Sequence, residues 1–463
     1  MGQGSAAFSA AIKANSLGVK TVMIGSNATK GAVLGGTCIN VGCVPSKRLI
    51  AVSTFFEEMR KHRYNGLNYT IGKLDYGKIV EEKDEIVRQL RKDKYSEVLE
   101  SLENVTFINS LGKFLDSNTL LAGKREISAK HILIATGARA APPPVEGAEK
   151  SGYLTNEEAL SMKELPESLI VVGGRAQGLE FAQLFARLGV RVTLLQRSER
   201  IIPNWEPEIS SYLTEYLEES GVKVVTNASL ARMEGAKGSK RVTATVKGKE
   251  EVFEAEEVLF STGRVPNVDE LNLDHTGVQL NEKKFIKVDS TLRTTSAGIY
   301  AAGDVTGEPM LETLAAKEGN VATSNIFEGA NRAINLNEVP SAIFTYPEAA
   351  MVGMTEVQVI KSRIKCSCSP LEFKIVAKSS IIGDKRGLAK IVIDYKTRKI
   401  LGVHILAPHA AELIHEGVLA VKLGLSIDDI IDTVHVFPTL SEGIKLSAMA
   451  FYQDVSKLSC CTV

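Results

Sequence analysis

Two pairs of cysteines are the residues of this chain whose types and spacing point most directly to chemistry. Cys38 and Cys43 lie in the segment GGTCINVGCVPSK (residues 35–47), and Cys460 and Cys461 are adjacent near the end of the chain. Thiolates bind soft metal ions and take part in redox chemistry, whereas adjacent cysteines form a disulfide only in a strained ring. The two pairs therefore favour relay of a soft metal ion over reduction of a peptide disulfide, with all four cysteines as predicted metal ligands.

The composition narrows the class of protein. A chain of 463 residues is too long for one core and predicts about three domains. Its 55 basic and 55 acidic residues balance, so no nucleic-acid partner is expected. No apolar run approaches the roughly 20 residues of a membrane span, and no signal peptide opens the sequence. We therefore expect a cytoplasmic protein without a membrane partner, whose six cysteines are catalytic or metal-binding rather than a disulfide scaffold.

The elements that must position the first cysteine pair begin with a glycine turn. Residues 2–7 read GQGSAA and match G-x-G-x-x-A, with a helix expected next and a strand over residues 19–24. Such glycines let the backbone approach a pyrophosphate at a helix N-terminus, so Gly2, Gly4 and Ala7 are predicted to bind a dinucleotide. The strand that normally precedes this motif is missing, so either the sequence begins late or another segment fills the sheet.

A second motif of strand, glycine turn and helix is complete. It spans residues 169–180, LIVVGGRAQGLE, with Gly173 and Gly178 in the turn, and a strand follows over residues 190–195. Gln196 then stands where an NAD enzyme carries an acid for the ribose 2′-hydroxyl. Arg197 and Arg200 are placed to bind a 2′-phosphate instead, unless they are solvated surface residues. The absence of an acid at the end of this strand, together with the two arginines, favours NADPH over NADH.

Repeated strand endings predict a duplicated architecture. The buried strand that ends at Thr136-Gly137 recurs as the strand that ends at Thr262-Gly263, and Asp304 closes a further strand, where it can bind a ribityl hydroxyl. We predict an α/β protein with two duplicated Rossmann-like nucleotide-binding domains and a C-terminal α+β domain with an interface role. The predicted boundaries are 1–147 and 271–336 for the first nucleotide domain, 148–270 for the second, and 337–463 for the C-terminal domain.

Together these motifs resemble the pyridine nucleotide-disulfide oxidoreductases, the flavoproteins related to glutathione reductase and lipoamide dehydrogenase, over essentially the whole chain. Within that family the terminal LSCC run (residues 458–461) and the stretch 451–455 are most similar to the mercuric reductases. The resemblance implies FAD on the first nucleotide domain, NADPH on the second, and a homodimer whose active site is shared across the interface of the C-terminal domains. It also implies the substrate, which is Hg(II) as a thiol complex, reduced to Hg(0).

The resemblance assigns roles to individual residues. It implies that Cys43 faces the flavin, that Cys38 is the more accessible thiol, and that Lys47 and Glu180 are paired beside the flavin. Tyr95 lies where mercuric reductases carry a tyrosine near the metal, although a packing role is equally open. The terminal cysteines of one subunit would collect Hg(II) and pass it to the dithiol of the other. The predicted cofactor-binding residues are Gly2, Gly4, Ala7, Gly36, Thr37, Lys47, Thr136, Gly137, Asp304, Gly173, Gly178, Arg197, Arg200 and Gly263.

Three departures from the family pattern bear on the substrate and on FAD. The thiol-disulfide branch carries His-Pro-Thr-x-x-Glu near its C-terminus, whereas residues 437–442 here read FPTLSE. A phenyl ring cannot exchange the proton that disulfide reduction needs, so Phe437 favours metal reduction unless His435 takes the role. Thr439 stands where a second metal-site tyrosine is expected, and Gly25 where many relatives carry an acid for the FAD ribose.

Two other functions remain open at this point. One is a dithiol or disulfide reductase that uses NAD(P)H and is similar to dihydrolipoamide dehydrogenase, and the other is a non-catalytic flavoprotein that sequesters metal. The run Cys366-Ser367-Cys368 could chelate a metal, but no other ligand neighbours it in the sequence, so it is assigned no role.

Overall fold

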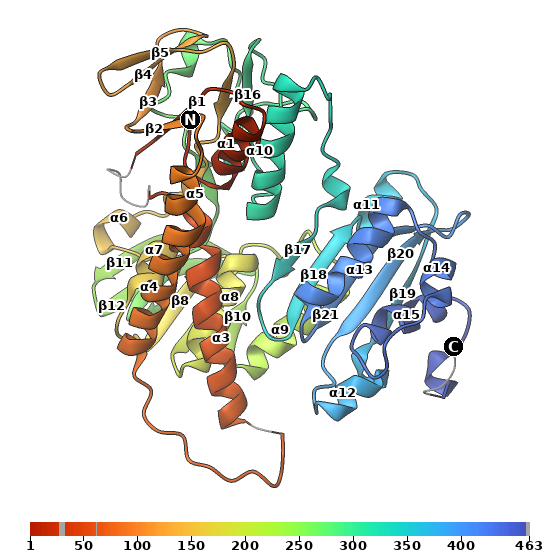
Figure 1. Cartoon of the computed structure of the whole chain (residues 1–463). Coiled ribbons are helices and arrows are strands. Elements are labelled where there is room, and N and C mark those ends of the chain that lie inside the picture. Colours follow the sequence, from red (N-terminus) through yellow and green to blue (C-terminus); the bar gives the residue numbers. More distant parts are fainter. Residues whose placement is uncertain (27–32, 62, 460–463) are drawn as a thin grey trace.

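The computed structural model describes residues 1–26, 33–61 and 63–459, so the predicted metal ligands Cys460 and Cys461 lie outside the described residues. Three units that combine helices and strands are visible in Figure 1. The first contains parallel pairs of strands, whereas the last is built on an antiparallel sheet. The first unit contains the N-terminus and returns late in the chain to complete itself, and the last carries the C-terminus. This order is the one that the repeated strand endings predict.

The first unit is divided between two parts of the sequence. Helix α1 packs against α10, which is some 300 residues away in the chain. The N-terminal elements are α1 Ser5–Ser16, β1 Thr21–Gly25, α2 Gly36–Val41, α3 Cys43–Arg60, α4 Tyr76–Arg91, the π-helical turn η1 Lys92–Ser96, α5 Glu97–Glu100, β2 Val105–Asn109, β3 Gly112–Phe114, β4 Thr119–Ala122, β5 Arg125–Ser128, β6 Ile132–Ile134 and β7 Ala138–Ala140. The later elements are β15 Arg264–Pro266, η2 Leu273–His275, β16 Ile299–Ala301, η3 Asp304–Thr306 and α10 Glu312–Phe327.

The parallel sheet of this first unit consists of two separate pairs of strands. β1 pairs with β2, β16 pairs with β6, and no strand of the described chain lies between the pairs. Met1 and Gly2 bridge the gap. The Met1 amino group donates to the Leu133 carbonyl at 2.6 Å, the Ala135 amide donates to Met1 at 2.7 Å, and the Gly2 amide donates to Ile24 at 2.8 Å. The central position that the motif requires is therefore held by these two residues, not by another segment.

The second unit has the continuous sheet that its sequence predicts. Four parallel strands lie in the order β10-β9-β8-β14, and β8 is buried on both faces, as its LIVV run requires. A three-stranded antiparallel sheet, β11-β12-β13, packs against it. Its elements are α6 Ala148–Ser151, α7 Asn156–Ser161, β8 Ser168–Val172, α8 Ala176–Arg187, β9 Arg191–Leu195, α9 Pro207–Glu219, β10 Val222–Val225, β11 Ala228–Ala236, β12 Ser239–Val246, β13 Lys249–Ala255 and β14 Glu257–Phe260.

The C-terminal unit is a five-stranded antiparallel sheet in the order β17-β18-β21-β20-β19, with helices packed on it (Figure 1). Helix α13 spans Ala410–Leu423 as predicted and ends at Gly424, whose φ of 65° is left-handed. The other elements are η4 Leu336–Glu338, β17 Ser341–Ile343, β18 Glu348–Gly353, α11 Glu356–Lys361, β19 Cys366–Glu372, η5 Phe373–Ile375, α12 Ala377–Ile381, β20 Leu388–Asp394, β21 Ile400–Ala407, α14 Ile427–Asp432, α15 Glu442–Met449 and η6 Val455–Lys457.

The predicted fold class is confirmed, because two nucleotide-type α/β units and a C-terminal α+β unit are all present. The residue boundaries of the domains stay predictions. None of the helices in the described ranges combines the length and the apolar composition that a bilayer crossing requires.

Candidate active site

The predicted redox cysteines lie where two helices meet. Cys38 is in α2, Cys43 is the first residue of α3, and Gly42 between them breaks the helix with φ −127° and ψ −114°. A Cβ atom at Gly42 would lie 2.9 Å from the Thr37 carbonyl oxygen, so the turn requires glycine. This break brings the two free thiols into hydrogen-bonding contact.

The hydrogen bond between the sulfurs makes the two thiols unequal. The Cys38 thiol donates to Cys43, which lowers the pKa of Cys43 and raises the pKa of Cys38. Lys47 lowers the pKa of Cys43 further, and Cys43 also opens an 18-residue helix, whose dipole favours a thiolate. Cys43 is therefore the thiolate of the pair and Cys38 the thiol.

The two thiols differ in exposure, and the roles of Cys43 towards the flavin and of Cys38 as the more accessible thiol stay predictions. In the chain alone Cys43 is exposed and Cys38 is only partly exposed.

Lys47 and Glu180 form the predicted ion pair. The Lys47 Nζ atom lies 2.7 Å from Oε2 of Glu180, which is buried in α8 of the second unit. The other oxygen of Glu180 accepts the Phe344 amide at 2.9 Å, and Lys47 Nζ lies 4.6 Å from the centroid of the Phe344 ring. The pair therefore joins all three units one helical turn from Cys43.

Tyr95 packs beside the dithiol helix rather than projecting into solvent. Its ring meets Phe8 of α1 edge-on at a centroid distance of 4.8 Å. A Cβ atom at Gly35, which precedes α2, would lie 3.1 Å from the same ring. Burial raises the pKa of Tyr95, while a hydrogen bond with Ser5 lowers it. Tyr95 thus contacts the first glycine turn as well as the approach to the dithiol.

The first glycine turn is built as a cradle for a dinucleotide. A Cβ atom at Gly2 would lie 2.0 Å from the Ala135 carbonyl oxygen, and one at Gly36 would lie 2.8 Å from Cα of Gly4. Ala7 is buried in α1. The first turn of α1 has neither an acidic residue nor a side-chain cap, so its amides face outward to an anion. These features fit the pyrophosphate of a dinucleotide, and the binding roles of Gly2, Gly4 and Ala7 stay predictions.

Gln3 occupies the place that the acid of relatives would need. A Cβ atom at Gly25 would lie 2.6 Å from Oε1 of Gln3, so a larger residue there is incompatible with this glutamine. The Gln3 amide nitrogen donates to the Ser26 carbonyl at 2.9 Å, whereas its buried oxygen accepts no hydrogen bond. The structure thus provides a buried acceptor at the end of β1, where sequence reasoning found only the missing acid.

Arg264 joins several of the predicted cofactor residues and was not predicted itself. It follows Gly263, and its guanidinium donates to Thr37 Oγ1 at 3.4 Å and to the Ala138 carbonyl. Its Nε atom lies 3.9 Å from Oδ2 of Asp304. Burial lowers the pKa of Arg264 and raises that of Asp304. The sequence signal was present, because arginine follows the repeated Thr-Gly ending.

Thr136 and Gly137 lie where the chain leaves the first unit, beside the segment by which it returns. The Thr136 hydroxyl donates to the Asn267 carbonyl at 2.8 Å, and the Asn267 amide donates to Gly137 at 3.0 Å. The strands that follow the two Thr-Gly endings, β7 and β15, therefore pair with each other as antiparallel neighbours.

Glu312 is a second site residue that sequence reasoning missed. It is the first residue of α10 and is partly buried. Its carboxylate contributes to raising the pKa values of Cys38, Cys43 and Tyr95, so it lies near all three. An acid at this position places a negative charge beside the dithiol, where it opposes a second thiolate and attracts a cation. Only the fold brings residue 312 to this site.

The second glycine turn is equally close-packed. Gly173 has a φ of 114°, and a Cβ atom on it would lie 2.4 Å from the Ser261 carbonyl oxygen. A Cβ atom at Gly178 would lie 1.8 Å from the Gly173 carbonyl oxygen. Gln196 is buried, and its side-chain oxygen accepts the Gly174 amide at 2.8 Å. The turn is therefore held open towards a nucleotide at the start of α8.

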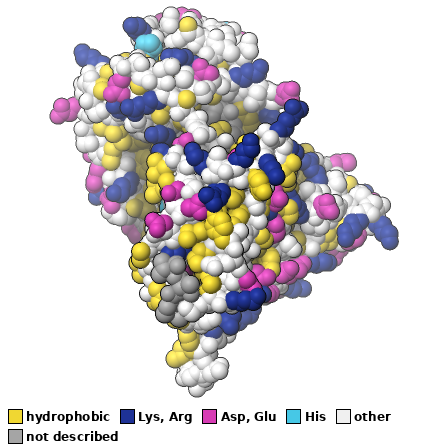
Figure 2. Space-filling view, turned by 90° about the vertical axis from the view of Figure 1, so that its right-hand side faces the viewer, with side chains coloured by type: hydrophobic (Ala, Val, Ile, Leu, Met, Phe, Trp, Pro, Cys, Tyr) yellow, Lys and Arg dark blue, Asp and Glu magenta, His cyan; other side chains and the backbone are white. Residues whose placement is uncertain are grey.

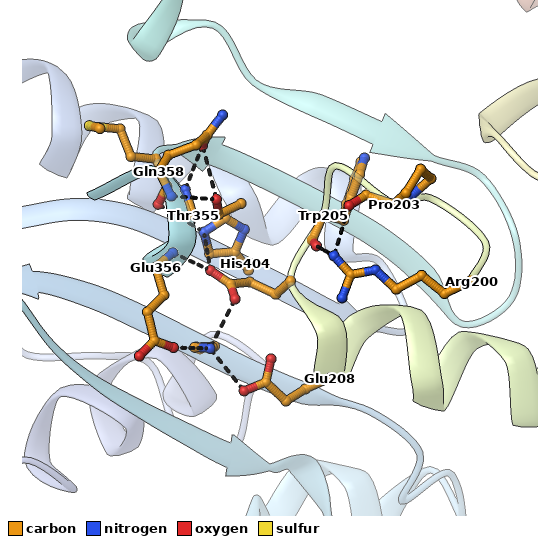
Figure 3. Close-up of polar contacts among 11 residues, drawn as sticks. Arg200, Pro203, Trp205, Glu208, Thr355, Glu356, Gln358 and His404 are labelled. Carbon is orange, nitrogen blue, oxygen red and sulfur yellow. Dashed lines mark hydrogen bonds and ion pairs between the residues drawn. The ribbon is translucent and has the colours of Figure 1, made fainter. Parts of the chain in front are cut away.

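The two arginines predicted to bind a 2′-phosphate have different surroundings. Arg197 is exposed directly after Gln196. Arg200 instead donates to the Pro203 carbonyl at 2.7 Å and to the Trp205 carbonyl at 3.3 Å, and Figure 3 shows its guanidinium group turned towards those two residues. Arg200 thus stabilises the loop before α9, and Arg197 is the arginine available to a phosphate.

The loop that carries Phe437 does not offer an alternative base. His435 lies between Glu416 Oε1 at 2.9 Å and the Thr433 carbonyl at 3.0 Å, and the contact with Glu416 raises its pKa. Phe437 itself is 51% exposed, and the neighbouring Val434 and Val436 are more exposed still. His435 is held against α13, while an apolar surface projects from the loop.

That apolar surface continues onto the helix beside it. Leu419 and Leu423 of α13 are exposed one turn apart, and the contact between His435 and Glu416 fixes the loop to the same helix. Figure 2 looks onto the side of the molecule occupied by the C-terminal unit and shows hydrophobic side chains gathered across that face. A patch of this kind on a folded chain marks an interaction surface.

A fold with two dinucleotide-binding units, in which a paired thiol and thiolate lie beside one nucleotide cradle, defines a flavin-type redox enzyme. Residues 1–319 match the pyridine nucleotide-disulphide oxidoreductase family, and residues 339–448 match the dimerisation domain of the same family. The chain therefore belongs to the pyridine nucleotide-disulphide oxidoreductases.

Individual relatives cover the whole chain. The mercuric reductase of Lysinibacillus sphaericus is 40% identical over 100% of this chain and 83% of its own length. The mercuric reductase of Bacillus cereus is 39% identical over 100% of this chain and 72% of its own length. The mitochondrial dihydrolipoyl dehydrogenase 1 of Arabidopsis thaliana is 34% identical over 98% of this chain and 89% of its own length. The crystal structure of LpdA from Mycobacterium tuberculosis superposes with a TM-score of 0.87 at 27% identity and covers 98% of this chain and 99% of that one.

Membership of this family establishes an oxidoreductase that uses a flavin and a nicotinamide nucleotide, and the matching dimerisation domain establishes a homodimer. The apolar surface formed by α13 and the loop 434–437 belongs to the unit that makes this dimer.

Proposed function

We propose that this protein is a mercuric reductase that uses NADPH and FAD to reduce thiol-bound Hg(II) to Hg(0) in the cytoplasm, where small thiols carry the metal. The observation that carries the proposal is the thiol–thiolate pair of Cys38 and Cys43 combined with a loop in which Phe437 replaces the histidine of disulfide reductases. The full-length similarity to mercuric reductases supports it.

The proposed chemistry at the dithiol needs no protein acid. The Cys43 thiolate displaces one small thiolate from Hg(II), and Cys38 passes its proton to the second small thiolate as it displaces it, because soft metals bind thiolate rather than thiol. Bound FAD supplies the path by which the electron pair of NADPH reaches this site. Overall the two electrons of NADPH reduce Hg(II) to Hg(0) and both sulfur–mercury bonds break. The proton that is released as NADPH becomes NADP⁺ returns Cys38 to its thiol form, so both cysteines end as they began.

Other residues of the chain prepare this step. Lys47 favours the thiolate of Cys43, and Glu180 holds Lys47 in place. The carboxylate of Glu312 adds negative charge that attracts the cation. Gly2, Gly4, Ala7, Gly36, Thr37 and Asp304 would hold the flavin dinucleotide, and Gly173, Gly178 and Arg197 would hold NADPH. The homodimer would bring the loop with Phe437, and Cys460 and Cys461, to the dithiol of the other subunit.

The test is NADPH oxidation by the FAD-loaded dimer with one acceptor at a time. The acceptors are Hg(II) in excess small thiol, oxidised lipoamide and glutathione disulfide. We expect oxidation with Hg(II) only, together with release of mercury vapour. Oxidation with a disulfide and not with Hg(II) would establish a dithiol reductase instead. Reduction of the flavin by NADPH without turnover of any acceptor would indicate a metal-sequestering flavoprotein.

A second arm tests the terminal cysteines. The double variant C460A/C461A should lose turnover of thiol-bound Hg(II) and keep flavin reduction by NADPH, because only metal transfer uses those thiols. Replacing Cys38 and Cys43 by serine is the matched control and should stop turnover with every acceptor. Equal loss of both half-reactions in C460A/C461A would contradict the capture role.

A further inference from the structure

Cys366 and Cys368 form a third pair of thiols, placed on the edge strand of the C-terminal sheet. β19 hydrogen-bonds only to β20, so its other side is open. Residues two apart on a strand point to the same face, and both cysteines are partly exposed free thiols. The two sulfurs are therefore neighbours on one face of the sheet, at its edge.

The surroundings of this pair are acidic, but the acids are already bound. Lys390 is opposite Pro370 in the β19–β20 register, so it shares the face of the two cysteines. Its ammonium lies 2.9 Å from Glu206, 2.8 Å from Glu208 and 2.8 Å from Glu356. Figure 3 shows Glu356 and Glu208 converging at this point. Lys390 thus neutralises the carboxylates, and the thiols are the donors left for a metal ion.

The Cys368 thiol is close enough to Glu356, Lys390 and Cys366 for each of them to affect its pKa. Burial raises the pKa of Cys368 to about 12, and Glu356 and Cys366 add to the increase. The thiol is therefore protonated when no ligand is bound, so a metal ion must displace a proton to bind it.

The spacing of the pair selects the kind of ligand. Two residues along a strand span about 6.6 Å, whereas a disulfide needs Cβ atoms roughly 3.5–4.5 Å apart, so the two sulfurs do not oxidise to each other without movement of the backbone. A metal ion between them bridges the longer span. Zinc would take about four protein ligands, and the one group of three or more metal-ligating side chains within the described residues is Glu206, Glu208 and Glu356, which contains no cysteine.

We propose that Cys366 and Cys368 form an accessory two-thiolate site for Hg(II), separate from the redox dithiol. Binding exchanges two small thiolate ligands of Hg(II) for the two cysteine sulfurs, and the two cysteine protons pass to the released thiolates, so no electron moves. The site lies on the C-terminal sheet, whereas Cys43 opens a helix of the first unit, so the ion held there is retained as Hg(II). The proposal requires only thiophilic metal and does not rest on the catalytic function.

The experiment uses the FAD-loaded dimer of the variant C38S/C43S/C460S/C461S, in which Cys366 and Cys368 are the only cysteines of the six. Hg(II) is titrated in and bound metal is counted by native mass spectrometry, with a small monothiol as competitor. We expect one Hg(II) per subunit and protection of both thiols from alkylation. C366S or C368S in this background should need on the order of 100-fold less competitor to release the metal, because chelation is lost.

Two results would overturn the proposal. The first is binding of two Hg(II) ions per subunit with a thiol bound to each, which would show two independent cysteines. The second is an unchanged competition curve in the single variants. If the fourfold variant does not fold, C366S/C368S in the otherwise native protein decides the matter. It should bind one Hg(II) fewer per subunit with unchanged flavin reduction by NADPH, and an unchanged stoichiometry would refute the site.

Discussion

Lys47 and Glu180 are 133 residues apart in the chain, yet their side chains form an ion pair of 2.7 Å. The pair links the helix that begins with the Cys43 thiolate to the helix of the second glycine turn. Because the carboxylate is buried and also accepts a backbone amide of the C-terminal unit, it fixes the lysine where its charge acts on Cys43. Thiolate formation is therefore coupled to the docking of three units.

The two partners of this ion pair should change the reactivity of Cys43 in opposite directions. Lys47 lowers and Glu180 raises the pKa of Cys43, which is below its ordinary value in the native protein. K47M should therefore move the pH midpoint of Cys43 alkylation upward and slow alkylation near neutral pH, whereas E180Q should move it downward. K61M, at the residue that follows the last residue of the same helix, is the matched control and should not change the pH midpoint of Cys43 alkylation. A shift of the same sign in K47M and E180Q would contradict the electrostatic account.

Replacing Arg197 should change the preference for NADPH over NADH, whereas replacing Arg200 should change only the stability of the protein. R197A should raise the KM for NADPH roughly tenfold or more and leave the KM for NADH unchanged, because a charge-assisted hydrogen bond to the 2′-phosphate is lost. R200A should lower the melting temperature and preserve the ratio of the two KM values, because its guanidinium binds carbonyls of its own loop. Loss of NADPH preference in R200A alone would reverse the assignment.

Gln3 should determine how tightly FAD is held. Its buried, unpaired oxygen lies beside Gly25, where relatives have an acid for the ribose. Q3A should raise the Kd for FAD roughly tenfold through the lost hydrogen bond, measured by flavin fluorescence after dialysis. K13A, near the far end of α1, should retain FAD as the native protein does. Full FAD retention in Q3A would show that the oxygen is not a flavin ligand.

Phe437 should control whether the dimer accepts disulfides. F437H introduces an imidazole on the exposed loop that His435 cannot supply, because His435 is bound to Glu416 and Thr433. Disulfide reduction should rise on the order of 100-fold, the usual gain from general acid–base catalysis, and Hg(II) reduction should stay the same. V436H at the adjacent exposed position is the control. Equal gains in both variants would show that position 437 has no special access to the dithiol.

Lys390 should stabilise the junction between the second unit and the C-terminal sheet. K390M leaves the buried carboxylate of Glu206 without its ammonium partner, which costs about 3–5 kcal/mol of unfolding free energy and is measured by urea denaturation. Adding E206Q and E356Q should recover part of the loss. K374M, which breaks an exposed pair with Glu372, should leave the transition unchanged. A K390M protein as stable as the native one would show that solvent reaches the cluster.

Much of the architecture followed from local patterns in the sequence. The run LIVV before the second glycine turn predicted a buried parallel strand, and β8 is one, because such a strand is covered on both faces. Helix α13 and the break between Cys38 and Cys43 also followed from residues close in sequence. The dithiol and the glycine cradles could therefore be named without a structure, whereas the pairing of Lys47 with Glu180 was implied only by the family resemblance.

Other features depended on residues that only the fold brings together. Glu312 reaches the dithiol because α10 packs on α1, Arg264 joins Thr37 to Asp304 although the three residues are far apart in the sequence, and the Gln3 oxygen fills the space beside Gly25. The sequence predicted that Arg200 binds a phosphate, and in the structure its guanidinium donates to a backbone carbonyl of its own loop. The sequence by itself determined the chemistry of each motif, because the motifs are short and their spacing fixes local geometry. The tertiary structure decided which charges and hydrogen-bond partners surround each group, because those neighbours come from distant parts of the chain and pack together only once the units are folded.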